Sequence, residues 1–130
     1  MDKQEFYIET GRLLYAIAKA DGIIQEAEHK KIIQIIREHL KPLDESQDAF
    51  GTENAFYTEF EFERLTDYDV KVRDAFQSFI EFAQDNKEDI TPELKKLIMA
   101  MVEKVAVVYN GTEDSEQALI DRLKRKLNEL

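Results

Sequence analysis

The sequence predicts an all-α fold, and three observations support this class. Apolar residues recur at spacings of three and four along most of the 130-residue chain, as they do on the buried face of a helix. Only four glycines and two prolines occur, so few residues interrupt helices. Recognisable start and stop signals separate the long segments. A chain of this length encloses one core, so we expect a single domain over residues 1–130.

The first two predicted helices are joined at Asp21-Gly22. The first covers about residues 3 to 20, and its inner stripe consists of Phe6, Leu13, Leu14 and Ile17. The second covers about residues 25 to 40, and its inner stripe consists of Ile32, Ile33 and Ile36. The second helix ends at Lys41-Pro42, because the residue before a proline disfavours the helical conformation.

The segment that follows has two competing periods. FGTENAFYTEFEFERL, residues 50 to 65, places Phe56 and Phe60 one helical turn apart. Acids and phenylalanines also alternate from Glu59 to Glu63, as they would in a strand. We predict a short helix within an irregular connection that spans residues 42 to 65.

Three further helices are predicted after this connection. Thr66 and Asp69 have the spacing of a cap for a helix over about residues 67 to 84, whose stripe is Tyr68, Val72, Phe76, Phe79 and Ala83. Thr91-Pro92-Glu93 is a strong start signal for a helix that we expect to be central, with Leu94, Leu97, Ile98, Met101, Val102, Val105 and Val108. Asn110-Gly111 ends it, and an amphipathic helix over about residues 115 to 130 follows.

The composition excludes several classes of function. Asp and Glu number 28 against 18 Lys and Arg, and this net charge of −10 disfavours nucleic acid and favours cations or a basic protein surface as partners. The absence of cysteine excludes disulfides and thiolate chemistry. No apolar run is long enough to span a membrane, and the first ten residues lack the pattern of a signal peptide. We therefore expect a cytoplasmic protein without direct membrane insertion.

The last predicted helix is basic near its C-terminus, at Arg122, Lys124, Arg125 and Lys126. Positive charge there complements the negative end of the helix dipole, so a solvated helix end is one interpretation. A docking patch for acidic partners is the other.

Two stretches of the chain share a helix-turn-helix pattern: AIAKADGIIQEAEHKKIIQII and VAVVYNGTEDSEQALIDRL. Their alignment pairs Asp21-Gly22 with Asn110-Gly111, Gln25 with Asp114, and Glu28 with Gln117. In both, glycine supplies a positive φ angle and an Asp or Asn hydrogen-bonds its own turn. The Glu or Gln three residues beyond the helix cap has capping-box spacing. Gly22, Asn110 and Gly111 are therefore predicted structural turn residues.

This paired pattern resembles the TerB-like family, which is named for bacterial tellurite resistance proteins. The matching residues are Ala20-Asp21-Gly22-Ile23 after an alanine-rich helix, with Glu28 just inside the next helix. The resemblance implies a bundle of two pseudo-repeated hairpins, an acidic surface, divalent cation binding by turn acids, and a non-catalytic role in stress-response complexes. The second copy departs from the pattern, because Asn110 and Gln117 stand where the first copy has acids.

Acidic residues at the two joints are candidate ligands for Ca²⁺ or Mg²⁺, which prefer oxygen donors. They are Asp21, Glu28, Glu113, Asp114 and Glu116. An EF-hand is excluded, because its first and third ligand positions would fall on Ile17 and Lys19. Capping and turn formation explain the same acids without a metal.

The remaining candidates are aromatic. Phe56, Phe60 and Phe62 either cap the open side of the bundle or form a groove for a protein partner. We find no catalytic motif, since His29 and His39 lie ten residues apart and no phosphate loop or nucleophile elbow occurs. We therefore expect a non-enzymatic interaction or scaffold module, with a cation-binding module as the alternative. Its oligomeric state is left open.

Overall fold

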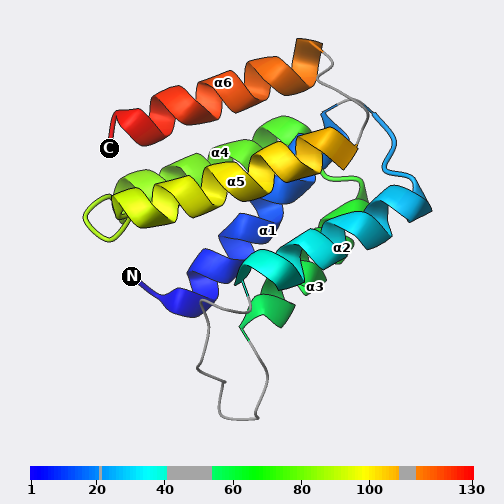
Figure 1. Cartoon of the computed structure of the whole chain (residues 1–130), viewed down its shortest axis with the longest axis horizontal. Helices are drawn as coiled ribbons and strands as arrows, with labels where there is room; N and C mark the ends of the chain where they lie inside the picture. The colour runs from blue at the N-terminus through cyan, green and yellow to red at the C-terminus, as the bar shows by residue number, and fades with distance from the viewer. Residues whose placement is uncertain (21, 41–53, 109–113) are drawn as a thin grey trace.

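The computed structural model describes residues 1–20, 22–40, 54–108 and 114–130. Within these ranges the chain forms six helices and no strand, which confirms the predicted all-α class for this part of the protein. The helices are α1 (Lys3–Lys19), α2 (Glu26–Leu40), α3 (Ala55–Tyr68), α4 (Val72–Asp85), α5 (Pro92–Val108) and α6 (Asp114–Asn128), as Figure 1 shows. They pack as a helical bundle.

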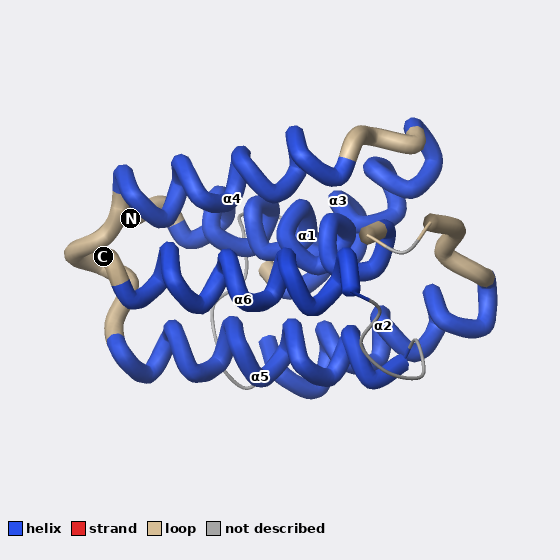
Figure 2. The backbone as a smooth tube through the Cα atoms, turned by 90° about the horizontal axis from the view of Figure 1, so that it is seen from above, coloured by secondary structure: helices blue, strands red, loops and turns tan. Residues whose placement is uncertain are grey.

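The central helix of the bundle is α1. It contacts α3, α4, α5 and α6, which surround it in Figure 2. Five consecutive residues have no exposed surface or almost none: Leu13, Leu14, Tyr15, Ala16 and Ile17. The expectation that the helix opened by Pro92 is central is therefore wrong. Its apolar stripe is longer, but α5 keeps an exposed face, whereas α1 is also buried along its polar side at Glu9 and Thr10.

A glycine allows α1 and α3 to cross closely. A Cβ atom at Gly11 would lie 2.7 Å from the backbone oxygen of Thr58 on α3, closer than carbon and oxygen approach in proteins. At the same crossing, the Thr58 hydroxyl donates a 2.6 Å hydrogen bond to the backbone oxygen of Tyr7. Because a Cβ atom at residue 11 would meet Thr58, this close crossing depends on the absence of a side chain there.

The boundary between α3 and α4 differs from the predicted one. Instead of capping a new helix, the Thr66 hydroxyl donates to the Phe62 carbonyl within α3. Asp69 takes a left-handed conformation with a φ of 50°, and the N–H groups of Asp69 and Val70 bond back to Thr66 and Leu65 in a Schellman arrangement. The helix therefore ends at Tyr68, whose side chain is 74% exposed rather than part of an inner stripe.

The start of α5 agrees with the prediction. The Leu94 N–H donates to the Thr91 hydroxyl at 3.2 Å, which satisfies one of the free N–H groups of the first turn. Pro92 occupies the first helical position, where its missing N–H has no partner to lose. Local sequence signals therefore place this helix correctly.

Candidate functional site

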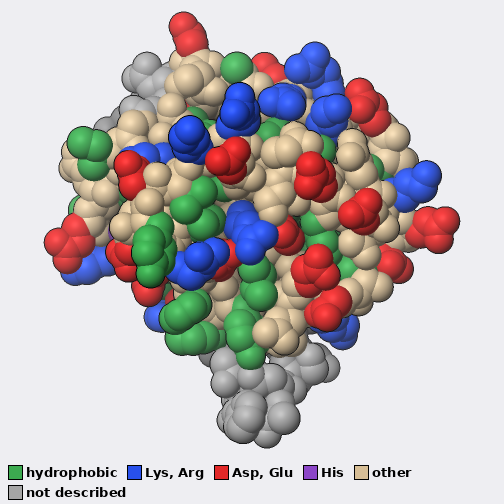
Figure 3. Space-filling model, turned by 180° about the vertical axis from the view of Figure 1, so that it is seen from behind, with side chains coloured by type: hydrophobic (Ala, Val, Ile, Leu, Met, Phe, Trp, Pro, Cys, Tyr) green, Lys and Arg blue, Asp and Glu red, His purple; other side chains and the backbone are tan. Residues whose placement is uncertain are grey.

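The outward face of α3 carries a pair of exposed phenylalanines. Phe56 and Phe60 lie one turn apart, their side chains are 51% and 57% exposed, and their ring centroids are 6.2 Å apart. Hydrophobic side chains gather on the face shown in Figure 3, in the region where α3 lies, between acidic and basic groups. We call the two rings the Phe56–Phe60 surface.

The third predicted aromatic residue occupies a different environment. Phe62 has no exposed surface, and its ring makes edge contacts with Tyr15 at 6.3 Å and His29 at 5.3 Å between centroids. Phe62 therefore belongs to the core, and only Phe56 and Phe60 are accessible to a partner. The sequence pattern did not distinguish the three rings, because a helical period and a strand period both fit residues 59 to 63 and bury different side chains.

The acids between these phenylalanines are buried. Glu59 is 8% exposed and accepts a 2.7 Å hydrogen bond from Arg37 Nε on α2. Glu61 is 5% exposed and accepts from Arg12 Nε on α1 and from Arg64 Nε, each at 2.6 Å. The helix thus turns two carboxylates inward and two aromatic rings outward, the reverse of the usual distribution.

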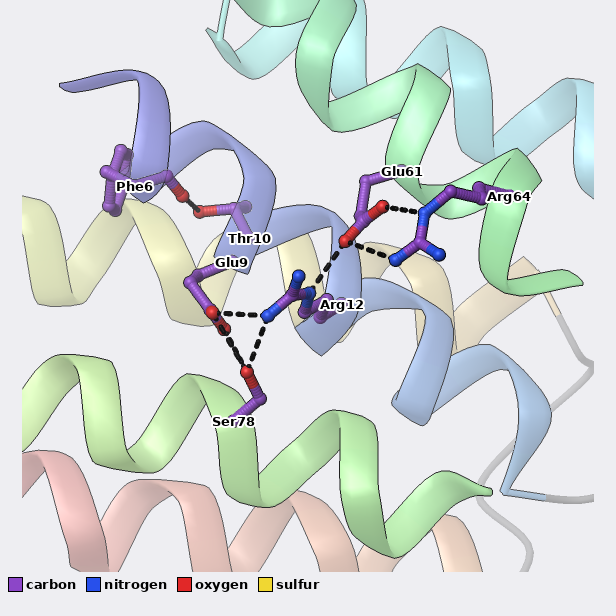
Figure 4. A network of polar contacts seen from close by, with 7 residues as sticks. All are labelled: Phe6, Glu9, Thr10, Arg12, Glu61, Arg64 and Ser78. Carbon is purple, nitrogen blue, oxygen red and sulfur yellow. Dashed lines mark hydrogen bonds and ion pairs between the residues drawn. The ribbon is translucent and has the colours of Figure 1, made fainter. Parts of the chain in front are cut away.

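Glu61 belongs to a polar network that connects three helices, shown in Figure 4. Arg12 on α1 also donates from Nη1 to Glu9 Oε1 at 2.7 Å and to Ser78 Oγ at 2.8 Å. The Ser78 hydroxyl on α4 donates in turn to Glu9 at 2.8 Å. The network joins α3 to α1 and α4 on the inner side of α3, opposite the Phe56–Phe60 surface.

The two acids of this network have pKa values shifted in opposite directions. Burial raises the pKa of Glu9, and the opposing contributions of Ser78 and Arg12 are smaller. Burial also opposes ionisation of Glu61, but hydrogen bonds and charges from Arg64 and Arg12 outweigh it, so its pKa is lowered. Sequence analysis did not single out these residues. Their local signals are two pairings at a spacing of three, Glu9 with Arg12 on α1 and Glu61 with Arg64 on α3.

The joint between α1 and α2 has the geometry of a capped turn. Gly22 has a φ of 121°, and its N–H donates to the Lys19 carbonyl at 2.8 Å. Glu28, the third residue of α2, accepts a 3.2 Å hydrogen bond from the N–H of Gln25. This is the return half of a capping box, so the carboxylate of Glu28 makes the contact that the structural interpretation predicts. Asp21 lies outside the described residues.

The joint between α5 and α6 does not repeat this arrangement in the predicted register. Asn110, Gly111 and Glu113 lie outside the described residues. The third residue of α6 is Glu116, which is buried, rather than Gln117. Gln117 donates instead to Asp121 at 2.8 Å, one turn further along the exposed side of α6. The pairing of Glu28 with Gln117 is therefore displaced by one residue, because α6 begins earlier than the alignment assumed.

The helix ends that flank the two joints nevertheless contact each other. The Ser115 hydroxyl donates to the Ala20 carbonyl at 3.2 Å, so the start of α6 meets the end of α1, as Figure 1 shows. Asp114, which is exposed, and Glu116 flank this contact in the sequence. Among the described residues, no group of three or more His, Asp or Glu side chains is placed to hold a metal ion.

The fold and the site define a helical bundle with an exposed aromatic pair on a helix that polar contacts hold in place. Comparison of the chain with protein-family models, with curated proteins and with solved structures finds no match. Across the described ranges, none of the helices combines the length and the apolar character needed to cross a membrane.

Proposed function

We propose that this chain is a non-catalytic interaction module of TerB-like type, which binds a protein partner through the Phe56–Phe60 surface. On this proposal it acts in the cytoplasm, in bacterial stress-response or tellurite-resistance complexes. The family resemblance of the Ala20-Asp21-Gly22-Ile23 turn supports the cellular role. The exposed Phe56–Phe60 surface supports the proposed binding of a protein partner.

The observation that carries the proposal is the orientation of α3. Phe56 and Phe60 are each about half exposed, so each forgoes roughly half of the ~1.5–3 kcal/mol that full burial of such a side chain contributes. Glu59 and Glu61, in contrast, are removed from water and require arginine partners. The Phe56–Phe60 surface gains free energy once an apolar group covers it, and exposed apolar patches of this kind mark interaction sites. Aromatic residues are also the commonest anchors of protein interfaces.

Site-specific photo-crosslinking tests this proposal. A benzophenone amino acid replaces Phe60 in one variant and Tyr68 in another, and both are expressed in the cells from which the chain derives. Tyr68 is the matched position, because it is an exposed aromatic residue on the same helix. We expect a discrete crosslinked protein from residue 60 and little from residue 68.

The captured protein is then purified and titrated against the intact chain by calorimetry. The double variant Phe56→Gln, Phe60→Gln should weaken its affinity at least about tenfold, as expected for loss of aromatic anchors, while Tyr68→Gln should change it less than about twofold. Equal affinities for all three proteins would refute the proposal. Sedimentation of the purified chain adds a further outcome, because self-association that Phe56→Gln abolishes would make a second copy the partner.

A divalent-cation module is the second candidate function, and one contact favours it. The hydrogen bond from Ser115 to Ala20 brings the start of α6, where the exposed Asp114 lies, next to the end of α1, and carboxylate oxygens are the ligands that Ca²⁺ and Mg²⁺ prefer. The capping bond of Glu28 to Gln25 weighs against it, since that carboxylate already has a structural partner. Calorimetric titration of Ca²⁺ into the wild type and into the variant Asp21→Asn, Glu28→Gln separates the two functions.

A further inference from the structure

A groove runs between α5 and α6, away from α3. These helices are antiparallel neighbours, as Figure 2 shows, and between them lies a hollow of about 410 Å³. Its apolar lining comes from Met99 and Ala100 on α5 and from Leu127 on α6. We call this hollow the α5–α6 groove.

The rim of the groove is basic, although the protein is strongly acidic. Lys95, Lys96 and Lys124 line it, against a single acid, Glu103. The chain as a whole has 28 acids and 18 Lys and Arg, so this local ratio reverses the general one. Lys124 approaches Glu103 at 3.7 Å, but both side chains are about half exposed, and exposed pairs of this kind attract each other weakly. The groove therefore presents net positive charge.

Two further features concern the α5 side of the groove. Lys95 and Lys96 lie in the first turns of α5, where the positive end of the helix dipole adds to their charge. At the other end, Val107 is 73% exposed and falls on the same helical face as Lys96, Ala100 and Glu103, by spacings of three and four. On this face the acid Glu103 lies between Ala100 and Val107, so the part of the groove that is both basic and apolar is its end near the start of α5.

We propose that the α5–α6 groove binds an acidic amphipathic helix of a partner protein. A third helix that lies along two antiparallel helices places its apolar ridge in their groove. Acidic residues on its flanks would then meet Lys95, Lys96 and Lys124. The groove shares no residue with the Phe56–Phe60 surface, so this binding site goes beyond the proposed function and fails or holds independently of it.

A model peptide tests the proposal directly. The probe is a fluorescein-labelled helical peptide of about five turns, with leucines on one face and glutamates on both flanks. Anisotropy is measured with the intact chain at about 150 mM salt, where charges further than about 8 Å away are screened. We expect saturable binding that weakens in stronger salt, and at least about tenfold weaker binding when lysines replace the glutamates.

Matched charge reversals locate the site. Lys95→Glu, Lys96→Glu, Lys124→Glu should lower the affinity at least about tenfold. The control variant Lys30→Glu, Lys31→Glu, Lys87→Glu changes the net charge by the same amount at exposed lysines outside the groove. Its affinity for the peptide should stay within about twofold of that of the wild type. Ala100→Glu in the groove should abolish binding, whereas Ala118→Glu, at another exposed alanine, on α6 and outside the groove, should not. Circular dichroism and thermal melts verify that each variant folds.

Several results would overturn the proposal. Absence of wild-type binding up to about 1 mM peptide, well beyond weak physiological affinities, is one. An equal loss of peptide affinity in both triple variants is a second such result, because it would show that binding depends on the net charge of the protein alone. A third is lysine-dependent binding to phosphatidylserine vesicles without binding to the peptide, which would identify a membrane surface as the partner. Phe56→Gln, Phe60→Gln should leave peptide binding unchanged, which keeps this test separate from that of the other surface.

Discussion

Arg12 Nε lies 2.6 Å from Glu61 Oε2, so a guanidinium on α1 and a carboxylate on α3 form an ion pair across 49 positions of sequence. Both groups lie at the centre of the network that includes Glu9 and Ser78. Glu61 faces α1 in this contact, whereas Phe60, the residue before it on α3, is 57% exposed. The ion pair therefore links the interior of the bundle to the exposed aromatic surface.

Replacement of Arg12 should destabilise the protein more than replacement of Arg64. Arg12→Ala removes the partner that Glu9 and Glu61 share and should lower the free energy of unfolding by about 3 kcal/mol, because buried carboxylates lose their counter-charge. Arg64→Ala leaves Arg12 on Glu61 and removes a more exposed side chain, so about 1 kcal/mol or less is expected. Urea unfolding at neutral pH measures both. Equal losses would show that Arg12 has no special role.

Glu9 should make the free energy of unfolding fall as the pH rises above 4.5, the ordinary pKa of a glutamate side chain. Its pKa is raised above 4.5 in the folded state, so between 4.5 and the raised pKa the folded protein binds more protons than the unfolded chain. Stability from this group is thus fully present below pH 4.5 and is lost as pH rises through the raised pKa. Thermal melts of wild type and Glu9→Gln across this range should diverge. Parallel curves would contradict the assignment.

Gly11→Ala should destabilise the bundle, although alanine favours helices. The new Cβ atom would meet the Thr58 carbonyl at 2.7 Å, and forcing two helices apart in a packed interior costs about 1–3 kcal/mol. The gain in helix propensity is smaller, about 0.5–1 kcal/mol. Denaturant unfolding should therefore show a net loss. A variant more stable than wild type would mean that α1 and α3 separate without loss of contacts.

Glu28→Gln should have little effect if Glu28 acts as a cap. A glutamine oxygen still accepts the hydrogen bond from Gln25, so the expected loss is about 0.5 kcal/mol or less. Calorimetric titration of Ca²⁺ into wild type and into Asp21→Asn, Glu28→Gln then separates the two functions. Saturable heat with a calcium-dependent rise in melting temperature in wild type alone would favour the cation module, since a bound ion stabilises the folded state.

Local sequence signals were sufficient at the start of α5 and at Gly22, although the cap predicted from Thr66 and Asp69 was wrong. Thr91-Pro92-Glu93 set the start of α5, Gly22 takes the positive φ expected of its turn, and Glu28 caps α2. These features involve atoms a few residues apart, so their geometry follows from chemistry that the sequence displays directly. The all-α class follows in the same way from the spacing of apolar residues.

Tertiary contacts decided what the local pattern left ambiguous. In residues 59 to 63 helix and strand periods compete. The folded chain is helical there, with Glu61 buried against Arg12, which is distant in sequence, and Phe60 exposed. Likewise, the central place of α1 depends on Gly11 lying against Thr58, a contact between residues far apart in the chain. The sequence by itself determined the all-α class and the capped start of α5, whereas the burial of a charge depends on a partner that only the folded chain brings within reach.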